Sequence, residues 1–219
     1  MAPLASRRPA SIRAEIAARS FGGVLSRAML GELGVDRHAV RNNVVARRWA
    51  LHGRWTVATH TLPLSAQARQ WRALWEVCGA DVALDGVSAL LAAGLSGFTQ
   101  ESIDVSVPKA SSPPAVADVR IHRVVRVNGE VINSGTPRVR AAVAAIRAAQ
   151  WAVSDRQAAL VVVMTVQQRL ATAQQLRQAA ELVRGRRRQS LITAVIGDVA
   201  DGAHSLGELD FAAACRRHG

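Results

Sequence analysis

Four side chains suited to reading DNA bases share one face of a short predicted helix. At 100° per residue, a helix that starts after Asp36 brings together His38, Arg41, Asn42 and Val45. Arginine can hydrogen-bond guanine O6 and N7, asparagine can pair with adenine N6 and N7, and a valine methyl can contact the thymine methyl. This face therefore predicts base contacts in the major groove of duplex DNA.

Arginines flank this face, and two valines lie opposite it. We expect phosphate contacts from Arg37, Arg47, Arg48 and Arg54. The opposite face carries Val40 and Val44, which predicts that it is buried against the rest of the module. The alternative interpretation is that such helices are common and that the arginines are ordinary solvated surface residues.

The elements around this helix follow the order of a winged helix-turn-helix, which we predict for residues 11–60. A first helix is expected at 11–19, and a short second helix between its cap Ser26 and the stop Gly34. The candidate recognition helix comes third, after the cap Asp36. A two-strand hairpin that turns at His52 and Gly53 completes the module. Residues 1–10 are expected to be a disordered lead.

The charge of the chain is strongly positive and unevenly distributed. The formal net charge is +12, and Lys109 is the only lysine among 28 basic residues. Residues 1–60 carry ten arginines against three carboxylates, a net charge of +7. This excess favours double-stranded DNA as a partner. A high arginine content is also what a GC-rich genome produces, so the charge has a compositional alternative.

Residues 65–200 are predicted to form a mixed α/β region that continues as helices. Strands are expected at 81–84, 101–108 and 118–127, and helices at 65–78, 87–93, 138–151, 155–170, 172–184 and 187–200. The expected helix caps are Asp155 and Thr172, and the segment INSGTP is expected to be a loop. We place Cys78 and the tryptophans Trp71, Trp75 and Trp151 in the core. The fold class predicted for the whole chain is α+β, mainly α.

The remaining motifs do not predict a catalytic or metal site. RGRRR at 184–188 is interpreted as a solvated linker rather than a phosphate contact. Asp201, His204 and Glu208 have a spacing that suits two metal ligands, but no third ligand is evident, and we expect no cofactor. Two cysteines form neither a disulfide framework nor a zinc set. The longest apolar run is too short for a membrane span, and the start has no signal-peptide core, so we expect a cytoplasmic protein without membrane partners.

The stretch GGVLSRAMLGELGVDRHAVRNNVVARRWALHGRWTV resembles the winged-helix module of AbiEi-type antitoxins. INSGTPRVRAAVAAI and WAVSDRQAALVVVMTVQQRL are similar to proteins of actinobacterial type that join this module to an antitoxin-like region, here 65–200. The resemblance implies an antitoxin and transcriptional regulator of a type IV toxin-antitoxin system. Its implied partners are double-stranded DNA, a cognate toxin and further copies of the chain.

The last residues carry a second resemblance. Ser205 and Glu208 have capping-box spacing before a predicted helix at 205–217. SLGELDF resembles the opening of a very-short-patch-repair endonuclease domain of the PD-(D/E)xK class, in which Glu208 matches the first acidic residue. The 205–219 segment would then be the first helix of a truncated nuclease domain, inactive as given and needing Mg²⁺ only when complete. A third alternative is a helical interaction protein that does not bind DNA.

Overall fold

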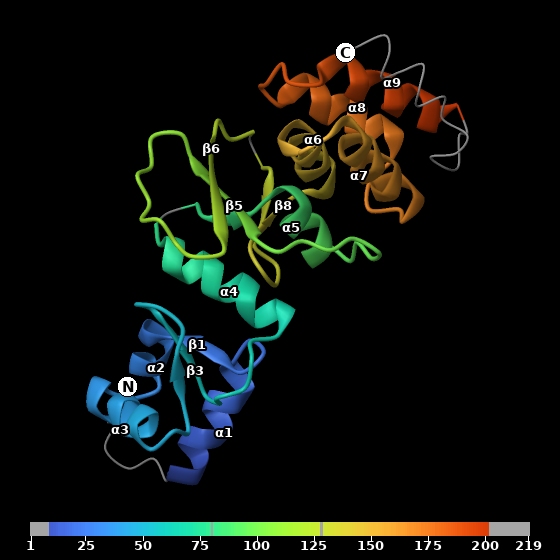
Figure 1. Cartoon of the computed structure of the whole chain (residues 1–219). Helices are drawn as coiled ribbons and strands as arrows, with labels where there is room; N and C mark the ends of the chain where they lie inside the picture. Colours follow the sequence, from blue (N-terminus) through green and yellow to red (C-terminus); the bar gives the residue numbers. More distant parts are fainter. Residues whose placement is uncertain (1–8, 80, 128, 202–219) are drawn as a thin grey trace. The chain divides into compact units, whose positions relative to one another are not determined.

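The computed structural model describes residues 9–79, 81–127 and 129–201 (Figure 1). The chain divides into two compact units, Met1–Cys78 and Gly79–Gly219. The boundary follows Cys78, whereas we expected the second region to begin at residue 65. The reason is that the helix after Ser65 packs on the first unit: Ala68 is wholly buried against Val24 and Ala58.

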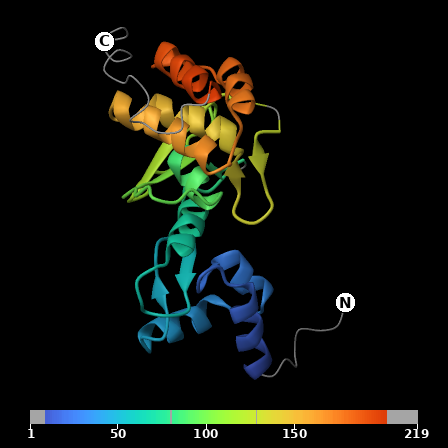
Figure 2. The same ribbon diagram turned by 90° about the vertical axis from the view of Figure 1, so that its right-hand side faces the viewer.

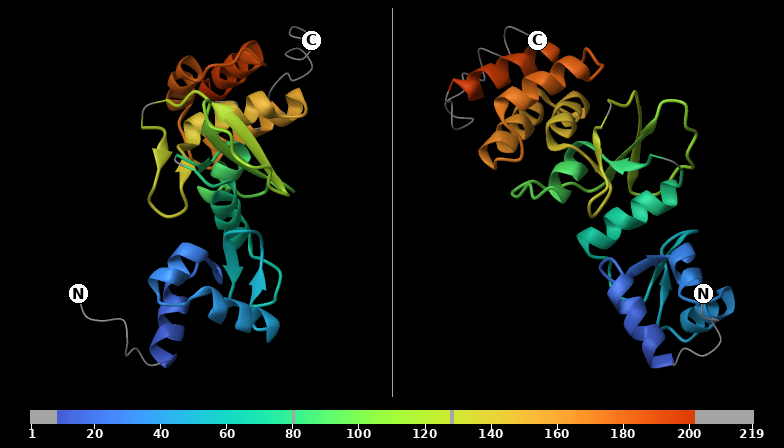
Figure 3. Two further views of the ribbon diagram at one scale, coloured as in Figure 1. Left: turned by 90° about the vertical axis from the view of Figure 1, so that its left-hand side faces the viewer. Right: turned by 180° about the vertical axis from the view of Figure 1, so that it is seen from behind.

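The first unit contains four helices and a three-stranded antiparallel sheet among its described residues. Its elements are α1 (Pro9–Arg19), β1 (Val24–Ser26), α2 (Arg27–Glu32), α3 (Arg37–Val45), β2 (Ala50–Leu51), β3 (Thr56–Ala58) and α4 (Ala66–Val77). The strand order is β1-β3-β2. The sheet lies between α4 on one face and α1 to α3 on the other (Figure 3).

Side-chain caps set the ends of α2 and α3 as the sequence predicted. Ser26 accepts a hydrogen bond from the N–H of Met29, and Asp36 accepts one from the N–H of Ala39. Gly34 adopts a φ of 78°, a conformation that glycine enters without strain, and it separates the two helices. The turn between α2 and α3 is therefore encoded locally.

Strand β1 was not predicted, because three residues carry too little pattern. Val24 and Leu25 are both fully buried, but on opposite faces of the sheet. Leu25 packs with Ile16, Leu30 and Val40 between the strands and α1 to α3. The strand is thus held by its neighbours on both sides rather than by its own propensity.

A buried carboxylate fixes the hairpin turn of the first unit. Glu76 of α4 is 7% exposed, and it accepts hydrogen bonds from the backbone N–H groups of Arg54, Trp55 and Thr56 at 2.7–2.8 Å. The Thr56 hydroxyl donates to the same carboxylate at 2.7 Å. A Cβ on Gly53 would lie 2.3 Å from the Glu76 carboxyl carbon, so the turn accepts only glycine there.

The second unit has a five-stranded mixed sheet. Its strands are β4 (Ala83–Leu84), β5 (Ile103–Pro108), β6 (Val119–Val124), β7 (Val131–Ile132) and β8 (Arg138–Val139), in the order β6-β5-β4-β8-β7. The β5–β6 and β4–β8 pairs are parallel, and the other two are antiparallel. The predicted loop is confirmed at 133–137, but the helix expected from residue 138 begins only at Ala141. Ile132 and Arg138 instead pair as the strands β7 and β8 across that loop.

Five helices accompany this sheet in the described part of the unit. They are α5 (Gly86–Ala92), α6 (Ala141–Trp151), α7 (Asp155–Gln167), α8 (Ala173–Leu182) and α9 (Gln189–Ala200). Helices α6 to α9 lie together on one side of the strands (Figure 2). The central helix is α6, which packs against α5, α7 and α8. Thr172 caps α8 as predicted, but the cap of α7 is Ser154 and not Asp155.

A buried ion network ties α6 to the sheet. Arg147 is 3% exposed and donates to Asp85 at 2.8 Å and to both carboxylate oxygens of Glu130 at 2.9–3.0 Å. Arg126 donates to the same Glu130 at 2.9 Å. Burial is the largest influence on Asp85 and raises its pKa against the opposing effects of Arg147, Ser106 and the Gly86 amide. Burial also acts on Glu130, but its hydrogen bonds outweigh it and lower the pKa.

The structure shows both helix and sheet, in agreement with the α+β prediction. Two core predictions need correction. Cys78 is exposed, because it follows the last turn of α4 with a φ of 51° and turns away from the helix stripe. All three predicted core tryptophans are partly buried: Trp71 and Trp75 pack against the core of the first unit, whereas Trp151 stacks on His122, with ring centroids 3.5 Å apart. The predicted lead at 1–10 is wrong at residues 9 and 10, which belong to α1. Residues 1–8 and the predicted helix at 205–217, with Glu208, lie outside the described residues.

We expect Glu76→Ala to destabilise the first unit by about 3 kcal/mol, because it leaves buried N–H donors without an acceptor. The measurement is urea unfolding of the full chain followed by tryptophan fluorescence, since four of the five tryptophans lie before residue 79. Glu32→Ala is the matched control. It removes the same charge from an exposed ion pair with Arg19 and should cost less than about 1 kcal/mol. Equal losses in the two variants would contradict this role for Glu76.

The ion network predicts opposite pH trends for its two carboxylates. The pKa of Glu130 is lowered on folding. The stability advantage of wild type over Glu130→Gln should therefore be fully present above pH 4.5, the ordinary pKa of this carboxyl group. It should disappear as pH falls through the folded-state pKa. The pKa of Asp85 is raised, so the stability of wild type relative to Asp85→Asn should be greatest at low pH and decline as pH rises. Urea unfolding between pH 3 and 7 tests both; parallel trends would refute the assignment.

Candidate nucleic-acid interface

The structure places the four predicted base-reading residues on the outer face of α3. His38, Arg41, Asn42 and Val45 are all exposed, and the exposed fraction of Val45 is 76%. Val40, on the opposite face, is 4% exposed and lies in the core. Val44 is partly buried and packs against the same core. The division into an outer polar face and an inner apolar face is as predicted.

The hairpin is fastened to the start of α2. The Nε of Arg27 donates to the carbonyl oxygen of Arg54 at 2.7 Å, and the Arg27 amide donates to the carbonyl of Trp55 at 2.8 Å. The Arg54 guanidinium lies 4.8 Å from the Trp55 ring centroid, a cation–π contact. These contacts hold the backbone of the turn and leave the Arg54 side chain exposed.

A neutral side chain orients Arg48, the second of the two arginines that follow α3. Arg47 takes a φ of 53° as the chain leaves the helix, and its side chain is exposed. The Nε of Arg48 donates to the side-chain oxygen of Asn43 at 2.9 Å, and Asn43 in turn donates to the carbonyl of Ala39. Arg48 is therefore positioned without losing its charge to a carboxylate.

The acidic residues of the first unit are engaged elsewhere. Glu15 contacts Ser11, Glu32 pairs with Arg19, Asp36 caps α3, and Glu76 is buried in the hairpin turn. Among the described residues no carboxylate pairs with the predicted contact residues Arg37, Arg41, Arg47, Arg48 and Arg54. The five arginines of α3 and the hairpin thus outnumber the carboxylates Asp36 and Glu76 beside them, and this excess of positive charge attracts phosphate.

Sequence reasoning missed the residues that position this surface. Arg27 precedes the hairpin in the sequence and Glu76 follows it, 49 positions apart, yet both contact its turn. The partly buried Asn43 of α3 accepts the hydrogen bond that positions Arg48. Only Glu76 left a signal in the sequence, as an acidic residue on the apolar side of its helix. Arg27 and Asn43 are of types common on any surface.

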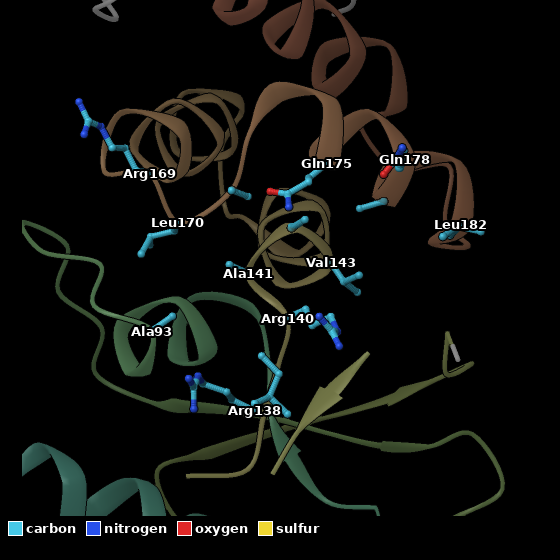
Figure 4. Close-up of a pocket in the computed structure, with 14 residues that line it drawn as sticks. Ala93, Arg138, Arg140, Ala141, Val143, Arg169, Leu170, Gln175, Gln178 and Leu182 are labelled. Atoms are coloured by element: carbon cyan, nitrogen blue, oxygen red, sulfur yellow. The ribbon is translucent and has the colours of Figure 1, made fainter. Parts of the chain in front are cut away.

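The second unit has a cavity of about 470 Å³ between α5, β8, α6 and α8. Its walls are formed mainly by small and apolar side chains, with Gln175 and Gln178 from α8 and Arg138, Arg140 and Arg169 also contributing (Figure 4). In Figure 4 the Arg169 guanidinium points away from Arg138 and Arg140, so the three cations do not converge. This cavity is mainly an apolar recess with polar edges.

The described residues contain neither a metal cluster nor a membrane span. No group of three or more His, Cys, Asp or Glu residues there could hold a metal ion. No described helix is long and apolar enough to cross a bilayer. Asp201 is exposed after α9, and its predicted companions His204 and Glu208 lie outside the described residues.

No family model and no curated protein matches this sequence. Among solved structures, the chain is similar to the Rv2827c protein from Mycobacterium tuberculosis, with 16% sequence identity and a TM-score of 0.56. The similarity covers 92% of this chain and 82% of that one. At this identity it shows a shared fold and nothing about activity.

The two faces of α3 predict different outcomes for the same substitution. Val40→Asp should cost the first unit more than about 3 kcal/mol, because it buries an unpaired charge in the core. Val45→Asp adds the same charge on the exposed face and should change stability by less than about 0.5 kcal/mol. Urea unfolding of both full-length variants is the measurement. Equal destabilisation would mean that α3 faces the core differently.

Proposed function

We propose that the protein is a DNA-binding regulator whose first unit is a winged helix-turn-helix. The observation that carries the proposal is the outer face of α3, where Arg41 and Asn42 are exposed and no carboxylate of the described residues pairs with Arg41. The order of α1, β1, α2, α3 and the β2–β3 hairpin supports it, since winged modules use this order.

In this proposal the residues divide into base contacts and phosphate contacts. Arg41 and Asn42, with His38 and Val45, meet base edges in the major groove. Arg37, Arg47 and Arg48 meet phosphates near the two ends of α3, and Arg54 does so from the hairpin. Glu76 and Arg27 act through the backbone of the turn and set where Arg54 lies.

The resemblance to AbiEi-type antitoxins supports an antitoxin that represses its own operon and binds a toxin through its second unit. The apolar recess between α5, β8, α6 and α8 is a suitable place for a protein side chain of such a partner. The endonuclease alternative depends on Glu208 and on a complete nuclease domain, and stays a prediction.

Loss of a base contact and loss of a phosphate contact should have different effects on DNA affinity. Arg41→Ala should weaken binding to the specific operator by about 1–3 kcal/mol and erode its ratio to random DNA. Arg54→Ala should weaken both DNAs alike and reduce the salt slope by about one unit. The measurement is a salt titration of each full-length variant on a fragment of its own promoter and on random duplex.

Arg156→Ala is the matched control, since it removes an exposed arginine of α7, in the second unit, that is outside the proposed interface. It should leave both affinities nearly unchanged. Absence of DNA binding by wild type at low salt, or identical behaviour of Arg41→Ala and Arg54→Ala, would reject the proposal.

A further inference from the structure

Basic side chains from distant parts of the sequence line one small pocket of the second unit. Lys109 follows β5, Arg123 lies on β6, and Arg184 follows α8. Arg147 and Gln150 of α6 form the inner wall. The pocket has a volume of about 240 Å³, and no acidic side chain lines it.

The three outer cations have no counter-ion among the described residues. Lys109, Arg123 and Arg184 are exposed, and none of them makes a hydrogen bond or ion pair with a described residue. Arg147 differs from these three, because Asp85 and Glu130 together neutralise both Arg147 and Arg126. That buried network contains two guanidiniums and two carboxylates, so it is neutral and does not offset the three outer charges.

The backbone of the RGRRR segment brings Arg184 to this pocket. Gly185 passes so close to α6 that a Cβ would lie 2.7 Å from the side-chain oxygen of Gln150. At the other end, Arg188 donates to Asp155 at 2.5 Å and to the carbonyl of Ala152 at 2.9 Å. The segment is thus held at Gly185 and at Arg188, which corrects its interpretation as a solvated linker for Arg188, whereas the Arg184 side chain is exposed. Arg186 and Arg187 are exposed between the anchors.

We propose that this pocket, lined by Lys109, Arg123 and Arg184, binds a phosphate group. Unpaired guanidinium and ammonium groups that share a small cavity repel one another, and an oxyanion with two negative charges relieves that repulsion. The volume is below the roughly 300–1,000 Å³ of typical small-molecule sites, which suits a single phosphate with ordered water. The ring of Trp151 is unavailable for stacking a base, since His122 covers one face and Gly86 approaches it closely.

The phosphate can belong to a free small molecule or to a nucleic-acid backbone, and the chemistry at the pocket is the same. The inference concerns the second unit and does not depend on DNA binding by the first. The two are separable, because inorganic phosphate can be titrated in the absence of any DNA.

The first arm titrates inorganic phosphate into the full chain at constant ionic strength and follows the amide NMR shifts near residues 109, 123 and 184. Saturable shifts are expected in wild type. Arg123→Gln/Arg184→Gln should weaken phosphate binding by about tenfold or more, because it removes two charge-assisted contacts. Arg186→Gln/Arg187→Gln removes the same charge from the same segment outside the pocket, and should stay within about twofold of wild type.

The second arm titrates random duplex DNA against salt with the same variants. If nucleic acid supplies the phosphate, Arg123→Gln/Arg184→Gln should flatten the salt slope by about one unit more than the control does. If a free phosphate compound is the ligand, the two double variants should show the same slope while phosphate binding is lost only in the first. Circular dichroism and thermal melting confirm that each variant is folded. No saturable phosphate binding by wild type, or equal losses in the two double variants, would overturn the proposal.

Discussion

The hairpin beside α3 depends on a single buried carboxylate. Three consecutive N–H groups of a tight turn need acceptors, and Glu76 supplies them from a helix that follows the turn in the sequence. Because the carboxylate also requires Gly53 at close approach, the turn and α4 fit each other in one arrangement. The placement of Arg54 and the pairing of β2 with β3 both follow from that arrangement. The buried Glu76 thus sets the position of Arg54, which lies at the surface.

In the second unit, too, a buried charged side chain joins distant segments, but its charge is positive. There the central group is a buried guanidinium, Arg147, which joins the start of α5, the segment before β7 and the middle of α6. A buried charge is tolerated only when its partners are complete. Asp85 and Glu130 come from loops that are 45 residues apart, so the network closes only when the sheet and α6 are both in place. The cluster at Asp104, which contacts Gln100, Arg120 and His122, repeats the pattern beside Trp151.

These internal roles explain why so much positive charge is left outside. The chain has few carboxylates, and several of them serve as caps or as buried partners rather than as surface counter-ions. The exposed arginines of α3 and of the 184–188 segment are therefore unneutralised by their described neighbours. A compositional excess of arginine alone would leave charge scattered over the surface, whereas here it gathers on the outer face of α3 and around one pocket of the second unit.

The sequence by itself determined the local features. The caps Ser26, Asp36 and Thr172, the alternation of β5, and the opposition of Val40 to Arg41 and Asn42 were all readable, because each depends on residues within one or two turns of the chain. Tertiary structure decided the rest. Strands β1, β7 and β8 are too short to show a pattern. A distant strand supplies hydrogen bonds to β1 and to β8, and β7 pairs with the neighbouring β8. Glu76 contacts the hairpin and Arg147 contacts Asp85 across 20 or more positions of the sequence. The pocket of the second unit likewise brings Arg184 to Lys109 and Arg123, which are themselves 14 positions apart. No local rule links such residues, since only packing of the whole unit brings them together.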